Sequence, residues 1–276
     1  MATFVIVHGG FGGGWEWSPV ARLLRGLGHE VYTPTLTGMG ERTHLASTQV
    51  VGLSTHVQDV VGLLEFENLH DVVLCGAGFG GMAVTCAADR VAHRVGLVMY
   101  VDALVPHDRE SALDLLPPEF SDFVRSSLAE YGETWRIPTM VDPVPPGSFS
   151  RIEEPAYIAR LRDHPVMTLV EPIYLTGAID HLPRAFVRCI REEPLDEHDV
   201  DPIEAIAMRA HDAGWHYREL MAPHDPHLSH PNATARLMAD LAVNVRDKLP
   251  SSFAHFPTQP SRGRRWDTQN WAWSPN

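Results

Sequence analysis

The sequence has few cysteines and no long apolar run. Its 276 residues include three cysteines, Cys75, Cys86 and Cys189, without the spacing of a metal site or of a disulfide framework. No apolar stretch is long enough to span a membrane, and Met1 leads directly into the first apolar run without a basic leader. We therefore expect a soluble, cytoplasmic protein that needs neither a metal ion nor an organic cofactor.

Basic residues are also scarce. Lys and Arg together number 22 against 35 Asp and Glu, which gives a formal net charge of -13. Long-range repulsion from this charge disfavours nucleic acids and anionic membranes as partners. We expect a small-molecule substrate, and a homodimer stays open.

Short apolar runs alternate with helical patterns through most of the chain. The runs that favour buried strands are 3–7, 30–34, 71–75, 96–101, 172–176 and 215–220. Helical patterns begin at Ser18 and cover 55–65, the stretch after 80, 183–191 and 233–249. This alternation predicts an α/β fold with a mostly parallel sheet and helices on both faces.

Residues 106–171 interrupt the alternation. Eight prolines lie between Pro117 and Pro165, with short helical pieces such as 120–131. We interpret 1–105 and 172–249 as one core and 106–171 as an inserted lid. Residues 250–276 are rich in Pro, Ser, Arg and Trp without periodicity, which predicts a partly ordered C-terminal tail.

The stretch from Asp71 to Arg90 joins an apolar strand to a helix through a glycine-rich turn. With the motifs around it, this stretch resembles the α/β-hydrolase superfamily. The resemblance is closest to the branch of hydroxynitrile lyases, plant methyl-ester esterases and bacterial esterases. It covers residues 3 to 248, and its motifs lie at 7–15, 36–42, 55–61, 76–81, 100–106 and 222–225. It implies an α/β-hydrolase fold.

The turn departs from the family pattern. The family usually has G-H-S-x-G-G, with the serine nucleophile exposed on a strained strand-to-helix turn. Here residues 76–81 are G-A-G-F-G-G, so Gly78 stands where that serine would be. Neighbouring Cys75, Thr85 and Cys86 are not placed to present a side chain there.

The resemblance implies three further parts of a site. The N–H groups of Gly10, after the first strand, and of Phe79, after Gly78, would bind an oxyanion. His224, in the A-P-H-D motif after the last strand, would be the catalytic histidine.

Two carboxylates could orient His224. Asp180 follows the 172–176 run in a G-x-x-D pattern, where most of the superfamily places its acid. Asp102 closes the 96–101 run, a placement that some lipases use. We favour Asp180 and keep Asp102 as the alternative.

Five aromatic residues and one methionine near the predicted site favour an apolar or aromatic substrate, although ordinary core packing would explain them equally well. They are Phe11 and Trp15 in the core, with Phe120, Phe123, Trp135 and Met140 in the lid.

Three functions are compatible with this pattern. The first is an enzyme that acts on a small carbonyl compound by His224 acid–base catalysis, as a lyase, cyclase, decarboxylase or water-mediated hydrolase. The second is a serine esterase whose nucleophile is replaced by Gly78, naturally or by engineering. The third is a non-catalytic protein that binds a small ligand. An oriented base argues against the third function, because a receptor has no need of one. The sequence gives little ground for choosing between the first two, and we favour the first.

Overall fold

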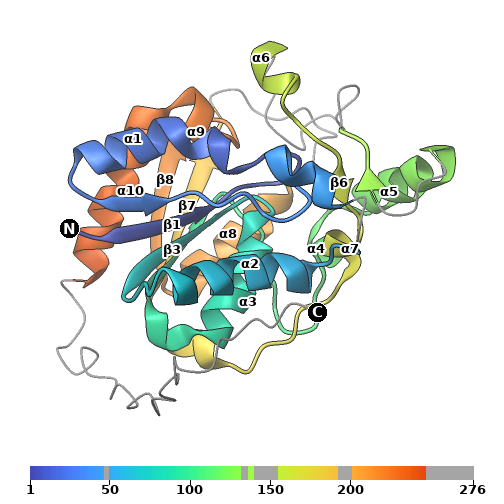
Figure 1. Cartoon of the computed structure of the whole chain (residues 1–276). Coiled ribbons are helices and arrows are strands. Elements are labelled where there is room, and N and C mark those ends of the chain that lie inside the picture. Colours follow the sequence, from blue (N-terminus) through green and yellow to red (C-terminus); the bar gives the residue numbers. More distant parts are fainter. Residues whose placement is uncertain (47–49, 132–135, 140–154, 192–200, 247–276) are drawn as a thin grey trace, which may run out of the picture.

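A six-stranded parallel sheet forms the centre of the molecule (Figure 1). The structure is a computed structural model that describes residues 1–46, 50–131, 136–139, 155–191 and 201–246. The strands are β1 (Thr3–Val7), β2 (Glu30–Tyr32), β3 (Val72–Ala77), β4 (Val95–Val101), β7 (Arg184–Ile190) and β8 (His216–Met221). They lie in the order β2-β1-β3-β4-β7-β8. The chain reverses its direction of travel across the sheet between β1 and β3, where open α/β sheets usually bind ligands.

Two predicted elements were wrong. The run 172–176 is not a strand, and its backbone is held by Asp108 and Asp89, which accept hydrogen bonds from Leu175 and Thr176 N–H. The stretch 183–191 is not a helix but contains β7. Short apolar runs are ambiguous between buried strand and buried helix, and pairing with β4 and β8 decides the outcome here.

Both faces of the sheet are covered by helices, and alternate strand residues face the two layers. In β1, Phe4 and Ile6 pack with one layer, while Val5 and Val7 pack with the other. The first layer contains α1 (Ser18–Gly26), α9 (Pro226–Ser229) and α10 (Pro231–Arg246). The second contains α2 (Leu53–Phe66), α3 (Gly80–Arg90) and α8 (Pro202–Asp212). Such double coverage explains why the strands are apolar on both sides.

The register of the sheet brings the carboxyl ends of four strands together. Val7 of β1 lies opposite Gly76 of β3, and Ala77 lies opposite Val101 of β4. Val101 in turn lies opposite Val187 of β7. The residues that follow these strands therefore meet at one edge of the sheet.

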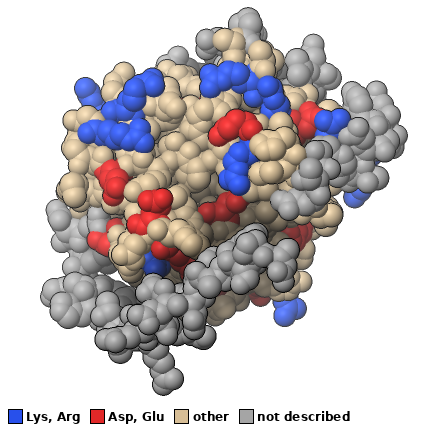
Figure 2. Space-filling model, viewed as in Figure 1, with Lys and Arg blue, Asp and Glu red and all other residues tan. Residues whose placement is uncertain are grey.

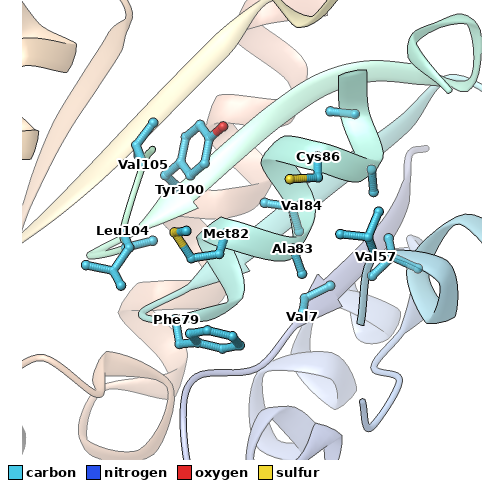
Figure 3. Packing of buried hydrophobic residues seen from close by; sticks show 14 of the residues in the cluster. Val7, Val57, Phe79, Met82, Ala83, Val84, Cys86, Tyr100, Leu104 and Val105 are labelled. Carbon is cyan, nitrogen blue, oxygen red and sulfur yellow. The ribbon is translucent and has the colours of Figure 1, made fainter. Parts of the chain in front are cut away.

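Helix α3 is buried nearly throughout its length and packs directly beneath this edge. Figure 3 shows Met82, Val84 and Cys86 of α3 among apolar side chains from β1, α2 and β4. A Cβ on Gly80 would lie only 2.5 Å from the carbonyl oxygen of His8. Glycine at position 80 therefore permits the close approach of α3 to the loop after β1.

Residues 106–171, the predicted lid, contribute no strand to the six-stranded sheet in their described part. They form α4 (Ala112–Leu115), α5 (Pro118–Tyr131), β5 (Arg136–Ile137), α6 (Pro155–Ile158), β6 (His164–Pro165) and α7 (Met167–Val170). Strands β5 and β6 make a separate antiparallel pair, which places His164 opposite Ile137. Short 3₁₀ helices elsewhere are η1 (Gly14–Trp17), η2 (Gly40–Leu45), η3 (Ala92–Arg94) and η4 (Ala178–His181). The predicted tail, 250–276, lies outside the described residues.

The surface carries charges of both signs. On the face drawn in Figure 2, basic side chains lie along the upper part and acidic ones across the middle. Within the described ranges, no helix combines the length and the apolar character needed to cross a membrane.

Candidate active site

The site is organised around a hydrogen bond between His224 and Asp102. His224 lies three residues beyond the end of β8, and Asp102 directly follows β4. Nδ1 of the imidazole lies 2.8 Å from Oδ2 of the carboxylate, and the two side chains are 10% and 4% exposed. Because a carboxylate only accepts hydrogen bonds, Nδ1 carries the proton and Nε2 is the basic nitrogen of the neutral ring.

Strand β7 holds Asp102 in place. Oδ1 of Asp102 accepts hydrogen bonds from Arg188 Nη1 at 2.8 Å and from the N–H of Cys189 at 3.0 Å. The N–H of Asp102 donates to the carbonyl oxygen of Val187 at 2.8 Å. Arg188 also pairs with Asp201. With His224 on its other oxygen, Asp102 has the partners that a buried carboxylate requires.

The preference for Asp180 as the partner of His224 was therefore wrong. Asp180 lies in η4, is 66% exposed and pairs with Arg184 at 3.4 Å. It lines a cavity of about 540 Å³ between α3 and α8, a cavity that His224 and Gly78 do not line. The expectation depended on a strand at 172–176, and the chain forms no strand there.

Electrostatics favour a protonatable His224. Burial opposes its protonation, but the hydrogen bond to Asp102 and the charges of Asp102, Asp225 and Asp201 outweigh burial, so the pKa of His224 lies above its usual 6.5. Burial likewise opposes ionisation of Asp102, but His224, Arg188 and the Cys189 N–H lower the pKa of Asp102 below its usual 3.8. The pair is thus built to stabilise an imidazolium beside a carboxylate.

Gly78 lies beside the Nε2 atom of His224. Its φ of +50° is in the left-handed region, which glycine adopts readily and other residues only with strain. A Cβ at this position would lie 3.3 Å from His224 Nε2 and 3.7 Å from the Cα of Gly9. With glycine there, no side chain of residue 78 lies against Nε2.

The two predicted oxyanion donors lie next to each other. A Cβ on Gly10 would lie 4.0 Å from the Cβ of Phe79. Within the part of the chain that the structure describes, neither backbone N–H donates a hydrogen bond. His8 orients the first donor, because its Nδ1 lies 2.7 Å from the carbonyl oxygen of Gly9. In a trans peptide this directs the Gly10 N–H to the opposite side.

Sequence reasoning missed His164, which lies against both predicted donors. Its ring is 4.7 Å from the Phe79 ring in an edge-to-face arrangement, and its Nδ1 is 3.5 Å from the Cβ position of Gly10. Neighbouring Phe11 is 5.4 Å from the same ring. His164 lies in the irregular, proline-rich 106–171 segment, so no periodic pattern pointed to it.

Sequence reasoning also missed Arg188. Its signal was available, because a lone arginine within the apolar run A-F-V-R-C-I of residues 185–190 must find carboxylate partners if that run is buried. Assigning the run to a helix concealed this requirement.

The aromatic residues predicted to line the pocket have different surroundings. Phe11 is partly buried beside His164, whereas Trp15 contacts Tyr157 and the guanidinium of Arg160. In α5, Phe120 and Phe123 contact each other and pack on the main core cluster. Trp135 and Met140 lie outside the described residues. Among the described side chains, no group of three or more His, Cys, Asp or Glu is arranged to hold a metal ion.

Comparison with known proteins identifies similar sequences. The chain is 48% identical over 117 residues to the carbendazim hydrolyzing esterase of Nocardioides sp. (strain SG-4G), which is 42% of this chain and 48% of that protein. It is 31% identical over 109 residues to Methylesterase 2 of Arabidopsis thaliana, which is 39% of this chain and 41% of that protein. The matched region thus spans about half or less of the length of these curated relatives.

Comparison of structures and of family models extends the similarity to most of the chain. An extracellular alpha/beta-hydrolase from a Paenibacillus species superposes with a TM-score of 0.73 at 24% identity, over 87% of this chain and 98% of that one. The model of the Alpha/beta hydrolase family matches residues 4–237. This match covers the sheet, the glycine-rich turn and His224. The chain belongs to the alpha/beta hydrolase family.

Proposed function

We propose that this protein hydrolyses a small, apolar or aromatic ester or related carbonyl compound, with His224 as the general base and no covalent step at residue 78. One observation carries the proposal: the hydrogen-bonded His224–Asp102 pair places Nε2 3.3 Å from the Cβ position of Gly78, where the residue itself has no side chain. The similarity to a carbendazim hydrolyzing esterase supports hydrolysis over other carbonyl chemistry.

The reaction follows from these groups. His224 Nε2 takes a proton from a water molecule as the water oxygen attacks the carbonyl carbon, and Asp102 stabilises the imidazolium that forms. The carbonyl oxygen becomes an oxyanion that accepts hydrogen bonds from the N–H groups of Gly10 and Phe79. When the intermediate collapses, Nε2–H returns the proton to the leaving alkoxide. The products are a carboxylic acid and an alcohol.

The lining of the site suits an apolar acyl group. Phe79 is 7% exposed. Phe11, which follows Gly10 in the loop after β1, is partly buried and packs against the main core cluster. Aromatic side chains next to the donors exclude water from the developing charge, which strengthens the two hydrogen bonds.

A second candidate is an esterase that has lost its nucleophile. The position of a Cβ at residue 78, 3.3 Å from His224 Nε2, is where a serine hydroxyl could reach the base. In this case the protein binds esters but does not turn them over at a useful rate. The other predicted functions are lyase, cyclase and decarboxylase activity, and ligand binding without catalysis. They stay predictions, because a panel of esters does not test them.

The experiment compares the parent protein with His224→Ala on a panel of 4-nitrophenyl esters. General-base catalysis typically contributes about 10²- to 10⁴-fold, so we expect kcat to fall by that amount. His230→Ala is the matched control, because His230 is exposed and pairs with Ser229. Mass spectrometry during turnover should find no acyl adduct. A parent rate untouched by His224→Ala would rule out the base assignment, and absence of turnover in the parent would favour the second candidate.

A further inference from the structure

His164 lies at an unusual place for a residue of the inserted segment. It belongs to β6, the short strand paired with β5, and its side chain is 1% exposed. It lies against both residues that carry the predicted oxyanion donors. Its ring centroid is 4.7 Å from that of Phe79, and its Nδ1 is 3.5 Å from the Cβ position of Gly10. A buried polar ring in this position must have a defined set of hydrogen bonds.

Those hydrogen bonds fix the tautomer of His164. The N–H of Phe11 points at Nδ1 over 3.4 Å, so Nδ1 is an acceptor. On the other side, Nε2 lies 2.6 Å from Thr168 Oγ1, and this hydroxyl donates its own proton to the carbonyl oxygen of Pro165 at 2.7 Å. Nε2 is therefore the N–H donor to Thr168. Burial, together with nearby His56 and His8, lowers the pKa of His164 well below 6.5, which keeps the ring neutral and Nδ1 free to accept.

The accepted N–H belongs to a strained residue. Phe11 has a φ of +63°, a conformation that is strained for a non-glycine residue and persists only when its surroundings hold it. Two contacts from the inserted segment provide this hold. The Phe11 N–H points at His164 Nδ1, and the Phe11 carbonyl oxygen accepts from the N–H of Arg162 at 2.8 Å.

Phe11 directly follows Gly10, the predicted oxyanion donor, in the loop after β1. On the other side of Gly10, the carbonyl oxygen of Gly9 is fixed by His8. His8 is part of the core, whereas His164 comes from the inserted segment, so the loop is held from two independent parts of the fold. Within the loop, the carbonyl oxygen of Gly10 also accepts a hydrogen bond from the N–H of Gly12 at 2.8 Å, so His164 adds to a peptide that is already partly restrained.

We propose that His164 is a positioning residue: by accepting the Phe11 N–H it holds the Gly10–Phe11 peptide, which adjoins the Gly9–Gly10 peptide whose N–H would face the substrate carbonyl oxygen. The inserted segment thereby acts on the predicted oxyanion hole through Phe11. This inference rests on the proposed function for its catalytic consequence, but its structural content can be tested by ligand binding alone.

Two variants separate the acceptor from the bulk of the ring. His164→Asn puts an amide oxygen near the place of Nδ1 and preserves an acceptor for the Phe11 N–H. His164→Leu fills similar space without any acceptor. The matched control is His230→Leu, the same substitution at an exposed histidine. Circular dichroism and thermal unfolding identify any variant that fails to fold.

Kinetics provide the first measurement. Loss of an oxyanion donor costs about 10²- to 10³-fold in kcat, and we expect its misalignment in His164→Leu to cost about 10- to 100-fold with KM nearly unchanged. His164→Asn should stay close to the parent. If His164 had a purely structural role, KM would change instead, or kcat would fall by the same factor in His164→Leu and His164→Asn.

A binding measurement makes the test independent of turnover. The probe is 2,2,2-trifluoroacetophenone, an aryl ketone with a strongly polarised carbonyl oxygen, titrated against each protein and followed by ¹⁹F NMR. We expect His164→Leu to weaken its Kd by about tenfold, while His164→Asn binds like the parent. This pattern in a parent without esterase activity would support the role of His164 and refute the proposed function. Equal Kd and kcat in parent and His164→Leu would overturn the inference, as would failure of the folded parent to bind the probe.

Discussion

Substitution of Gly78 by serine tests the relation between residue 78 and His224. The new Cβ would lie 3.3 Å from His224 Nε2, slightly inside ordinary contact distance, and the hydroxyl one bond further on lies within reach of the base. The φ of +50° is retained only at a cost of about 1–2 kcal/mol for a residue with a Cβ. For a chain of this size, that cost lowers Tm by about 2–8 °C.

The gain in activity should greatly exceed this loss in stability. A serine that joins His224 and Asp102 completes a nucleophile–base unit, whose members contribute about 10⁶-fold together. Because the turn is not otherwise adapted to serine, we expect Gly78→Ser to raise kcat on 4-nitrophenyl acetate by a smaller amount, on the order of 10²- to 10⁴-fold. A burst of 4-nitrophenol and a mass increase of one acetyl group should accompany the gain.

Gly78→Ala is the matched control, because it adds the same Cβ and the same strain without a hydroxyl. Its methyl group occupies the space beside Nε2, so the water-mediated reaction of the parent should fall while Tm falls as in Gly78→Ser. If Gly78→Ala kept the full parent rate, water would not be activated at this place. If Gly78→Ser gave neither a burst nor an adduct, the reasoning that places Nε2 within reach of residue 78 would be refuted.

The remaining predictions concern the charges around His224. Asp102→Asn should lower kcat by about 10²- to 10⁴-fold in ester assays, whereas Asp180→Asn should leave it unchanged; the reverse result would restore Asp180 as the partner. Arg188→Met leaves the buried carboxylate of Asp102 and the half-buried one of Asp201 without their shared cation. Urea titration should therefore show a loss of about 3–5 kcal/mol in the free energy of unfolding, and a loss below 1 kcal/mol would contradict it. The pH profile of kcat/KM should rise to a plateau through a pKa above 6.5, because His224 must be neutral to act as a base, and a midpoint below 6.5 would contradict the raised pKa of His224. The same raised pKa stabilises the fold fully below pH 6.5, and this contribution disappears as the pH rises through the folded-state pKa of His224.

Local patterns in the sequence were sufficient for much of the fold. Strands β1, β2, β3, β4 and β8 lie close to their predicted positions. Strands β1, β3 and β4 are short apolar runs bounded by turn residues, whereas β2 and β8 contain charged residues at exposed positions. The glycine-rich turn at 76–80 was found because a strand-to-helix turn that packs this closely needs glycines in a fixed order. His224 was found by its place after the last strand.

The partner of His224 could not be obtained in this way. Asp102 and Asp180 both follow apolar runs, and choosing between them required knowing that β7 lies between β4 and β8. This order places Arg188 and the Cys189 N–H beside Asp102 and leaves Asp180 at the surface with Arg184. Pairing between strands distant in sequence has no local signature.

The sequence by itself determined the glycine at position 78 through residue identity, and the order of its motifs, through their resemblance to a known family, was sufficient to predict the scaffold and His224. The tertiary structure alone decided that Asp102 is hydrogen-bonded to His224 and that His164 contacts Phe11 in the loop after β1. His164 and Phe11 are 153 residues apart in the chain, and their contact depends on how the inserted segment packs against the core. Packing of that kind is set by the whole fold and not by the residues on either side of the contact.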